Sequence, residues 1–163
     1  MLKITTVESS DVSAICQIYN HYIDHTVVTF EEEPVSKVAM LARIEQTQLQ
    51  SLPWLIAHHQ DEVIGYAYGT PWRSRSAYRY SVEVSVYLSE AFHGRGIGSL
   101  LYESLFAELK KIGITTAIAG ITLPNEKSIA LHEKMGMHKV AHFKKVGLKF
   151  DRWLDVGYWQ VSW

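Results

Sequence analysis

The sequence predicts an α/β domain in which about four helices flank one mixed β-sheet. Three observations lead to this fold class. The chain has 163 residues, a length that suits one domain spanning residues 1–163. Strand and helix patterns alternate through its middle, whereas its ends are rich in strand patterns, an order that favours a mixed sheet. No repeat, low-complexity tract or linker-like stretch divides the chain.

The first half of the chain contains two predicted helices between predicted strands. Residues 2–7 (LKITTV) predict a short strand, and Ser10 or Asp11 can cap the helix that follows. A second helix is expected after Pro34, and residues 53–59 and 62–69 predict two strands joined by a turn. The apolar residues at helical spacing are Val12, Ile15, Cys16, Tyr19 and Ile23 in the first helix, and Val38, Leu41, Ile44 and Leu49 in the second.

The second half begins with the clearest strand pattern, residues 78–88 (YRYSVEVSVYL), which alternates and is rich in valine and tyrosine. A glycine-rich loop and a helix follow. Residues 115–123 predict another strand, Asn125 or Glu126 begins a short helix that ends near Gly136, and residues 137–146 and 154–161 predict the last two strands. The helix after the glycines carries its apolar stripe on Ile97, Leu100, Leu101, Leu105, Leu109 and Ile112.

Composition narrows the class of function. The chain is 47% hydrophobic and 20% charged, with a net charge of −1 and no basic run, so nucleic acid is not expected as the main partner. No apolar segment is long enough to span a bilayer, and the first residues lack the apolar core of a signal peptide. We therefore expect a cytoplasmic protein without a membrane partner. The single cysteine, Cys16, excludes an internal disulfide and is expected to pack in the core.

Three glycines lie between the clearest strand and the next helix. Gly94, Gly96 and Gly98 read G-x-G-x-G, which is neither the dinucleotide fingerprint G-x-G-x-x-G nor a P-loop, since no G-K-[ST] follows. A glycine loop that leads into a helix offers free backbone N–H groups and a favourable helix dipole to a phosphate. The loop therefore predicts a phosphate or pyrophosphate site. A tight turn that needs glycine for its geometry alone is the alternative.

The segment VYLSEAFHGRGIGSLLYESL, residues 86–105, resembles the acetyl-coenzyme A loop of the Gcn5-related N-acetyltransferases (GNAT), whose pattern is Gln/Arg-x-x-Gly-x-Gly/Ala. Gly96 and Gly98 fit this pattern, and His93 stands where Gln or Arg is usual. LPNEKSIALHEKMGM is similar to the later segment of the family, an Asn followed by a helix that ends in Gly. TFEEEP, SVEVSVYL and the tail VGLKFDRWLDVGYWQ resemble the phosphinothricin and methionine sulfoximine acetyltransferase branch.

The resemblance implies a single-domain GNAT fold and a set of acetyl-CoA contacts. The pyrophosphate would bind the loop, and the pantetheine arm would pair with the end of the preceding strand. Asn125 and Ser128 would hydrogen-bond this arm, although capping of the next helix explains both residue types as well. The implied loop and strand contacts are Val86, Tyr87, Leu88, His93, Gly94, Arg95, Gly96, Ile97 and Gly98.

Acetyl transfer to an amine needs a base, since the amine is an ammonium ion at neutral pH. Glu83 is the one ionisable side chain in an apolar strand, and burial would raise its pKa toward that of a working base. The resemblance implies the same role, while strand alternation alone would also allow a solvated carboxylate. His132 stands where most of the superfamily has a tyrosine near the coenzyme sulfur, and imidazole can donate a proton to the leaving thiolate. A surface histidine is the alternative.

The acceptor is expected to be a small amino-acid-like molecule. Arg73, Arg75 and Tyr78 precede Glu83 in an arginine-rich, aromatic segment, and a guanidinium matches a carboxylate with two hydrogen bonds. A solvated loop with incidental arginines is the alternative, and single-stranded nucleic acid is a weaker one. The resemblance places Phe30, Glu31 and Lys149 at the same pocket. It implies methionine sulfoximine, methionine sulfone or phosphinothricin as acceptors.

Other interpretations stay open or are set aside. His21 and His25 lie four residues apart, but no third ligand stands nearby, so no metal is expected. The tryptophan-rich tail and the resemblance favour a homodimer. No cysteine or serine has a local activation motif, so direct transfer without a covalent enzyme intermediate is expected. The rivals are a GNAT enzyme for another amine (a polyamine, an aminoglycoside or a protein N-terminus) and a module that binds acetyl-CoA without catalysis.

Overall fold

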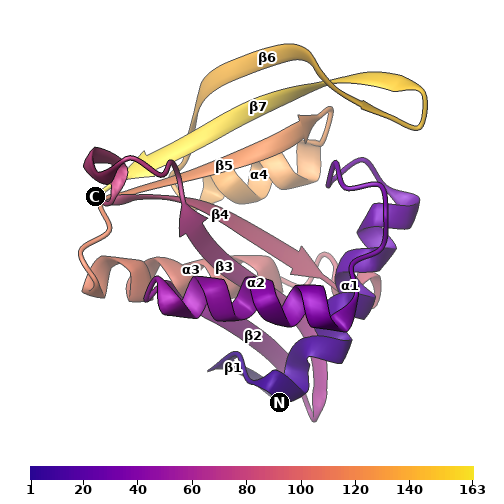
Figure 1. The fold of residues 1–163 in the computed structure, drawn as a ribbon, viewed down its shortest axis with the longest axis vertical. Helices are drawn as coiled ribbons and strands as arrows, with labels where there is room; N and C mark the ends of the chain where they lie inside the picture. The colour runs from indigo at the N-terminus through magenta and orange to yellow at the C-terminus, as the bar shows by residue number, and fades with distance from the viewer.

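All 163 residues are described by a computed structural model, in which seven strands form one twisted sheet (Figure 1). The strand order is β1-β2-β3-β4-β5-β7-β6. Strands β4 and β5 pair in parallel and all other neighbours are antiparallel, so the predicted mixed sheet is confirmed. The strands are β1 (Leu2–Thr6), β2 (Trp54–His59), β3 (Glu62–Pro71), β4 (Ser81–Leu88), β5 (Thr116–Leu123), β6 (His138–Lys149) and β7 (Arg152–Ser162).

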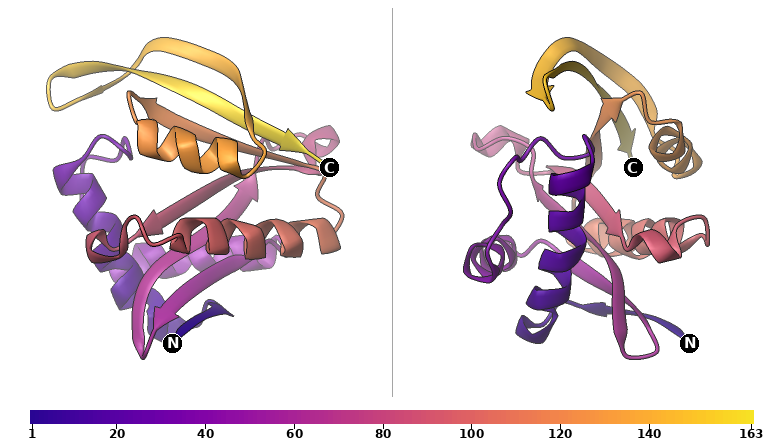
Figure 2. Two further views of the ribbon diagram at one scale, coloured as in Figure 1. Left: turned by 180° about the vertical axis from the view of Figure 1, so that it is seen from behind. Right: turned by 90° about the vertical axis from the view of Figure 1, so that its right-hand side faces the viewer.

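Four helices cover the two faces of the sheet, as the sequence predicts. The side view in Figure 2 places α1 (Val12–His25) and α2 (Lys37–Leu49) on one face and α3 (Ile97–Lys111) and α4 (Glu126–Lys134) on the other. Short 3₁₀ turns occupy Ser9–Asp11, Ser76–Tyr78 and Glu90–Phe92. None of the helices combines the length and the apolar character that crossing a membrane requires.

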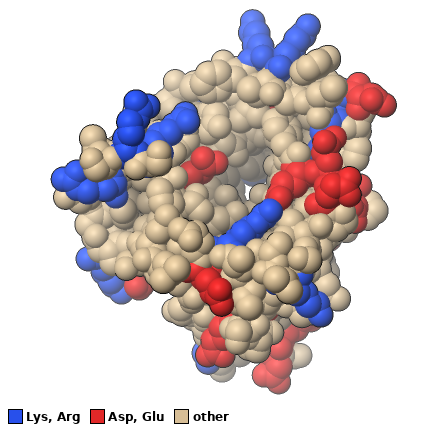
Figure 3. Space-filling model, viewed as in Figure 1, with Lys and Arg blue, Asp and Glu red and all other residues tan.

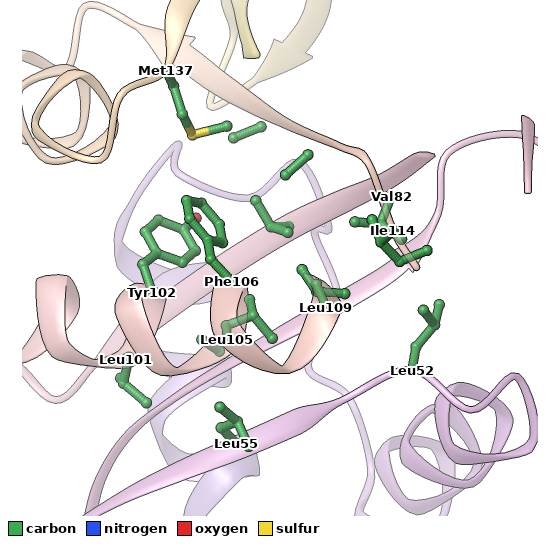
Figure 4. Close-up of a cluster of buried hydrophobic side chains, with 14 of the residues drawn as sticks. Leu52, Leu55, Val82, Leu101, Tyr102, Leu105, Phe106, Leu109, Ile114 and Met137 are labelled. Atoms are coloured by element: carbon green, nitrogen blue, oxygen red, sulfur yellow. The ribbon is translucent and has the colours of Figure 1, made fainter. Parts of the chain in front are cut away.

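Helix α3 follows the glycine loop directly, and its burial in the core fixes the position of the loop's C-terminal end. Leu101, Leu105 and Leu109 are fully buried against the sheet, and Figure 4 shows them between the helix and strands β2 and β4. Each such leucine contributes about 1.5–3 kcal/mol through burial. A second cluster fills the space between the opposite face of the sheet and helices α1 and α2, including the predicted core thiol of Cys16. The start of α3 is therefore held rigidly.

Two of the predicted apolar stripes are partly wrong. In α2, Val38 and Leu49 are each 81% exposed, while the buried stripe is Met40, Ile44 and Thr47. In α3, Leu100 and Ile112 are half exposed, and Tyr102 and Phe106 are buried instead. Both helices carry more apolar positions than one face can bury, so the packing partners rather than the periodicity decide which stripe faces inward.

The C-terminal hairpin is longer than the sequence suggests. Strand β6 runs to Lys149 and β7 starts at Arg152, so only Phe150 and Asp151 form the turn. Both turn residues have positive φ, 51° and 56°, as a two-residue hairpin turn with matching twist requires. Phe-Asp is not one of the residue pairs that usually announce such a turn, and the predicted strand therefore stopped too early. The longer hairpin extends over the region that holds the candidate site.

Candidate functional site

The glycine loop exposes a run of free main-chain donors. Gly94 and Gly96 have φ of 74° and 77°, in the left-handed region that glycine tolerates best, and Gly96 is the N-cap of α3. No N–H group from Gly94 through Ser99 donates to another backbone group, and the first one paired is that of Leu100, which donates to the Gly96 carbonyl. A Cβ at Gly94 or Gly96 would meet nothing within 4 Å. Open space in front of unpaired N–H groups suits a phosphate.

The side chains of His93 and Arg95 contact neighbouring residues and hold the loop in place. Tyr22 of α1 donates its hydroxyl proton to the Leu88 carbonyl, so the His93 Nε2–H donates to the Tyr22 oxygen at 2.8 Å. The Arg95 guanidinium lies over the Phe92 ring, 5.0 Å from its centre. The pKa of Tyr22 rises to about 12, mainly through burial, so this hydroxyl keeps its proton at neutral pH. His93 therefore supports the loop from the side of α1, and the free main-chain donors remain as a candidate anion site.

Strands β4 and β5 separate beside the loop. Their parallel pairing covers only Ser81 to Glu83, whereas β4 stays paired with β3 as far as Leu88. The Ser89 N–H donates to β3, so by alternation the main-chain groups of Val86 and the N–H of Leu88 point away from β3 and into the gap, while the Leu88 carbonyl accepts from Tyr22. The two strands thus splay apart after Glu83. The open edge of β4 offers a strand partner to an extended chain such as a pantetheine arm.

A pocket of about 310 Å³ lies on the α1 side of this gap. Glu83 lines it and makes no hydrogen bond or ion pair there. Burial raises the pKa of the Glu83 carboxyl, and the nearby Arg73 guanidinium lowers it to a smaller extent. The space-filling view shows a hollow in the middle of this face with acidic and basic groups around it (Figure 3). The lining residues are Val28, Thr29, Phe30, Glu83, Ser85, Tyr87, Gly120, Thr122, Phe143, Val146, Val156 and Tyr158.

A larger cavity, of about 480 Å³, lies between α2 and strands β2 and β3. Its wall contains the aromatic residues Trp54, Tyr66 and Tyr68 but no carboxylate or histidine. An amine that must lose a proton needs a base beside it. Of these two cavities, only the smaller one therefore contains a side chain that could act as a base toward an amine, Glu83.

The predicted arginines do not line the pocket. Arg73 follows β3, lies over the Trp72 ring with its guanidinium carbon 4.9 Å from the ring centre, and acts electrostatically on Glu83 from outside the pocket lining. Arg75 and Tyr78 are exposed in the turn that joins β3 to β4, and no ion pair or side-chain hydrogen bond involves either of them. Among the three residues, the structure thus brings only Arg73 near the candidate base.

His132 is buried in α4, being only 4% exposed, so the expectation of a surface histidine is wrong. Its Nδ1 lies 2.6 Å from the Ser128 carbonyl and must carry the proton, because a carbonyl only accepts. Its Nε2 then accepts from the Tyr102 hydroxyl at 2.9 Å. Burial lowers the pKa of His132. The ring is therefore neutral with both nitrogens engaged, and to protonate a leaving thiolate it would first have to exchange one of these partners.

Asn125 and Ser128 sit at the start of α4. The Asn125 side-chain oxygen accepts from the Ser128 N–H at 3.1 Å, so Asn125 caps the helix. The cap uses only the oxygen of the carboxamide, and its two N–H donors remain available. Capping and a contact to a pantetheine arm are therefore compatible.

Of the residues predicted for the acceptor pocket from the first loop and the tail, only some line the pocket at Glu83. Phe30 lines the pocket. Glu31 does not, because its carboxylate turns away toward α2 and binds Arg43 and Tyr19. Lys149 is 2% exposed and also lies outside the lining, because its Nζ donates to the Thr29 carbonyl at 2.7 Å. The two charged residues therefore fasten the pocket wall rather than face its interior.

Several lining residues were missed by sequence reasoning. Ser85 and Tyr87 share the strand face of Glu83, so alternation could have identified them. Gly120, Thr122 and Tyr158 come from β5 and β7, and nothing local marks them. Gly120 is notable because a Cβ there would come within 3.1 Å of the Tyr158 ring, which crosses the pocket floor. In addition, no three His, Cys, Asp or Glu side chains cluster in a way that could hold a metal ion.

Comparison with known proteins agrees with this geometry. Residues 4–157 match the model of the family described as "Acetyltransferase (GNAT) domain". A phosphinothricin N-acetyltransferase of Streptomyces viridochromogenes is 36% identical, covering 98% of this chain and 86% of its own. An L-methionine sulfoximine/L-methionine sulfone acetyltransferase of Salmonella typhimurium is 37% identical, covering 99% and 94%.

A solved structure is equally similar. It is a GNAT superfamily phosphinothricin acetyltransferase from Sinorhizobium meliloti in complex with acetyl-CoA, 34% identical, with a TM-score of 0.96 over 99% of this chain and 88% of that one. The predicted fold, the predicted family and the predicted class of enzyme are all confirmed. The chain belongs to the GNAT family of acetyltransferases.

Proposed function

We propose that this protein moves the acetyl group of acetyl-CoA to the α-amine of a small amino acid or amino-acid analogue, with Glu83 as the general base. One observation carries the proposal. Glu83 is the single carboxylate in a pocket at the point where β4 and β5 part, and burial raises its pKa. A carboxylate with a raised pKa takes up a proton more readily than an exposed glutamate.

The chain's own groups divide the remaining work. The N–H groups from Gly94 to Ser99 would bind the pyrophosphate, and Val86 and Leu88 would pair with the pantetheine arm through the gap. Acetyl-CoA supplies the activated acetyl group as a thioester. A main-chain N–H on the same open edge would donate to the thioester oxygen as negative charge develops on it. Protonation of the departing thiolate by His132 stays a prediction, because the neutral ring would first have to exchange its Ser128 or Tyr102 partner.

The nature of the acceptor follows from charge. The pocket interior offers one carboxylate, and the Arg73 guanidinium acts electrostatically on it from outside the lining. An ammonium at Glu83 with a carboxylate toward Arg73 matches this pair of charges, whereas a polyamine or aminoglycoside would need several acidic groups. The relatives named for phosphinothricin and for methionine sulfoximine or sulfone make these three amino-acid analogues the first acceptors to test.

We also propose that two copies associate through the hairpin of β6 and β7. Strand β6 is an edge of the sheet, and Leu148 and Trp153 face each other across the hairpin, 51% and 62% exposed. Large apolar side chains together on a sheet edge favour burial against a partner. A dimer through this hairpin would also brace Phe143 and Val146, which line the acceptor pocket from β6.

The proposal is tested with a thiol-release assay on two matched sets of amines. One set is methionine sulfoximine, methionine sulfone and phosphinothricin, and the other holds the same molecules without the α-carboxylate. We expect the first set to be turned over with a kcat/KM higher by about tenfold or more, the value of a charge-assisted hydrogen bond pair. Arg73→Ala should erase this difference, and Arg75→Ala, on the same exposed turn, should leave it. No turnover on either set, or equal turnover with and without the carboxylate, would overturn the assignment.

A further inference from the structure

The segment between α1 and α2 forms one wall of the acceptor pocket. Val28, Thr29 and Phe30 of this segment line the pocket. The segment contains no helix or strand. A loop of this kind holds a position only where side chains fix it. What fixes residues 28–31 therefore decides the shape of the wall that an acceptor would meet.

The strongest fixed point is Glu31. Arg43 of α2 binds it with two parallel hydrogen bonds, Nη1 to Oε2 at 2.8 Å and Nη2 to Oε1 at 2.5 Å. Tyr19 of α1 donates its hydroxyl proton to the same carboxylate. A forked guanidinium holds a carboxylate in one orientation, which a single lysine contact does not. Helices α1 and α2 thus grip the residue that directly follows the pocket wall.

The hydrogen bonds continue from Glu31 into the wall. Because Tyr19 gives its proton to Glu31, the Thr29 hydroxyl donates to the Tyr19 oxygen at 2.8 Å, and the Thr29 oxygen accepts the Glu31 N–H at 3.3 Å. The Thr29 carbonyl accepts from Lys149 of β6 at 2.7 Å. Beside it, a Cβ at Gly147 would overlap the ring of Phe30. Every element that touches this wall therefore acts on residues 29–31.

We propose that Arg43 is a positioning residue for the acceptor: through Glu31 it sets the place of Thr29 and Phe30 in the pocket wall, and so governs acceptor binding without touching acetyl-CoA. This inference rests on the proposed function. The protein groups that would bind acetyl-CoA lie on the glycine loop and the open edge of β4. None of them forms a hydrogen bond with Arg43, Glu31 or Thr29. Loss of the Arg43–Glu31 hydrogen bonds should therefore affect acceptor binding and acetyl-CoA binding differently.

Steady-state kinetics of Arg43→Gln, Glu31→Gln and the double variant test this role. We expect each single change to raise the acceptor KM by about 10- to 100-fold, the effect of a misplaced wall, and to leave the acetyl-CoA KM within about twofold. The double variant should be no worse than either single one, since both remove the same link. Arg43→Lys keeps the charge but loses the fork, and should recover only part of the affinity.

Two controls separate this role from a general loss of stability and from failure of the proposed function. Lys111→Gln breaks the exposed Glu108–Lys111 pair on α3 and should change neither KM. Hydrogen exchange of the Thr29 and Glu31 amides needs no turnover, and should accelerate in Arg43→Gln while exchange in α3 stays the same.

The outcomes differ for the two ideas. The wild-type protein could acetylate no amino acid while amide exchange at Thr29 and Glu31 still accelerates in Arg43→Gln. The proposed function would then fail, but the role of Arg43 in positioning the pocket wall would hold. Equal changes in both KM values, losses that multiply in the double variant, or unchanged amide exchange would overturn the role of Arg43.

Discussion

At the scale of single residues, the chemistry depends on how a few polar groups are buried. Glu83 has no hydrogen-bond partner, and burial raises its pKa, so the fold holds it in a state that costs stability and suits the proposed role in proton transfer. His132 is also buried, but it is fully paired, and burial lowers its pKa. The first group is free to react, whereas the second is held in place.

Glu83→Gln should separate activity from stability. We expect kcat/KM to fall by about 10²- to 10⁴-fold, the usual contribution of a general base. The folded pKa of Glu83 lies above its unfolded value, so the stability linked to this group is complete below the unfolded pKa and is lost as pH rises through the folded pKa. Glu83→Gln, which cannot ionise, should therefore have a higher Tm than wild type at pH 8, and this gain should vanish below roughly pH 4.

Thermal melts across pH and initial rates at saturating acetyl-CoA measure the two effects. Glu103→Gln, at an exposed position of α3, is the matched control and should change neither. Undiminished rates in Glu83→Gln would remove this residue from the role of base, and a lower Tm at pH 8 would contradict the account of its burial.

At the scale of elements, the unit that matters is β4, the glycine loop and α3. The buried leucines of α3 hold the helix, the left-handed glycines turn the chain into it, and the loss of pairing after Glu83 opens the edge of β4. Each feature leaves main-chain donors unpaired at one end of the sheet. Donors of this kind are costly unless water or a ligand satisfies them, which is the mark of a binding site.

Gly96→Ala tests this unit, and the chain supplies its own control. Gly96 and Gly113 have left-handed φ values of 77° and 85°, with nothing within 4 Å of an added Cβ, at opposite ends of α3. Each alanine should cost about 1–2 kcal/mol of stability through backbone strain. Only Gly96→Ala should also weaken acetyl-CoA binding, by about tenfold or more, as expected for a disturbed charge-assisted hydrogen bond. Calorimetric titration with acetyl-CoA and denaturant melts give both quantities, and equal affinities of the two variants would refute a pyrophosphate site at this loop.

At the scale of the whole molecule, the C-terminal hairpin extends beyond the helices and contributes to the lining of the pocket at Glu83. Its pocket residues and its exposed apolar residues lie on the same two strands, β6 and β7. Figure 1 shows these two strands above the rest of the sheet. The shape of the pocket is thereby linked to whatever covers the hairpin.

Trp153→Lys should dissociate the dimer proposed above, because a charge placed on an apolar edge opposes its burial. Light scattering after size exclusion should then give the 18.6 kDa mass of one chain instead of twice that mass. We expect the acceptor KM to rise at the same time, since Phe143 and Val146 would lose support, while the acetyl-CoA KM stays unchanged. A wild-type mass of one chain would exclude the dimer.

The sequence by itself determined the order of the elements, the glycine loop, the candidate base and the family. These features are local: periodicity, glycine spacing and a lone carboxylate in an apolar strand can be seen within about 20 residues of one another. The resemblance along nearly the whole chain then supplied the expected chemistry.

Only the tertiary structure decided which polar groups face the pocket. Lys149 and Thr29 are 120 residues apart, His132 and Tyr102 are 30 apart, and Glu31 meets Arg43 across two elements. The sequence shows that these residues are polar, but not which partner each finds, because a buried polar group binds whatever donor or acceptor the packing of distant elements brings to it. For the same reason Glu31 and Lys149 have the residue types expected of substrate ligands, yet they hold the wall of the pocket instead.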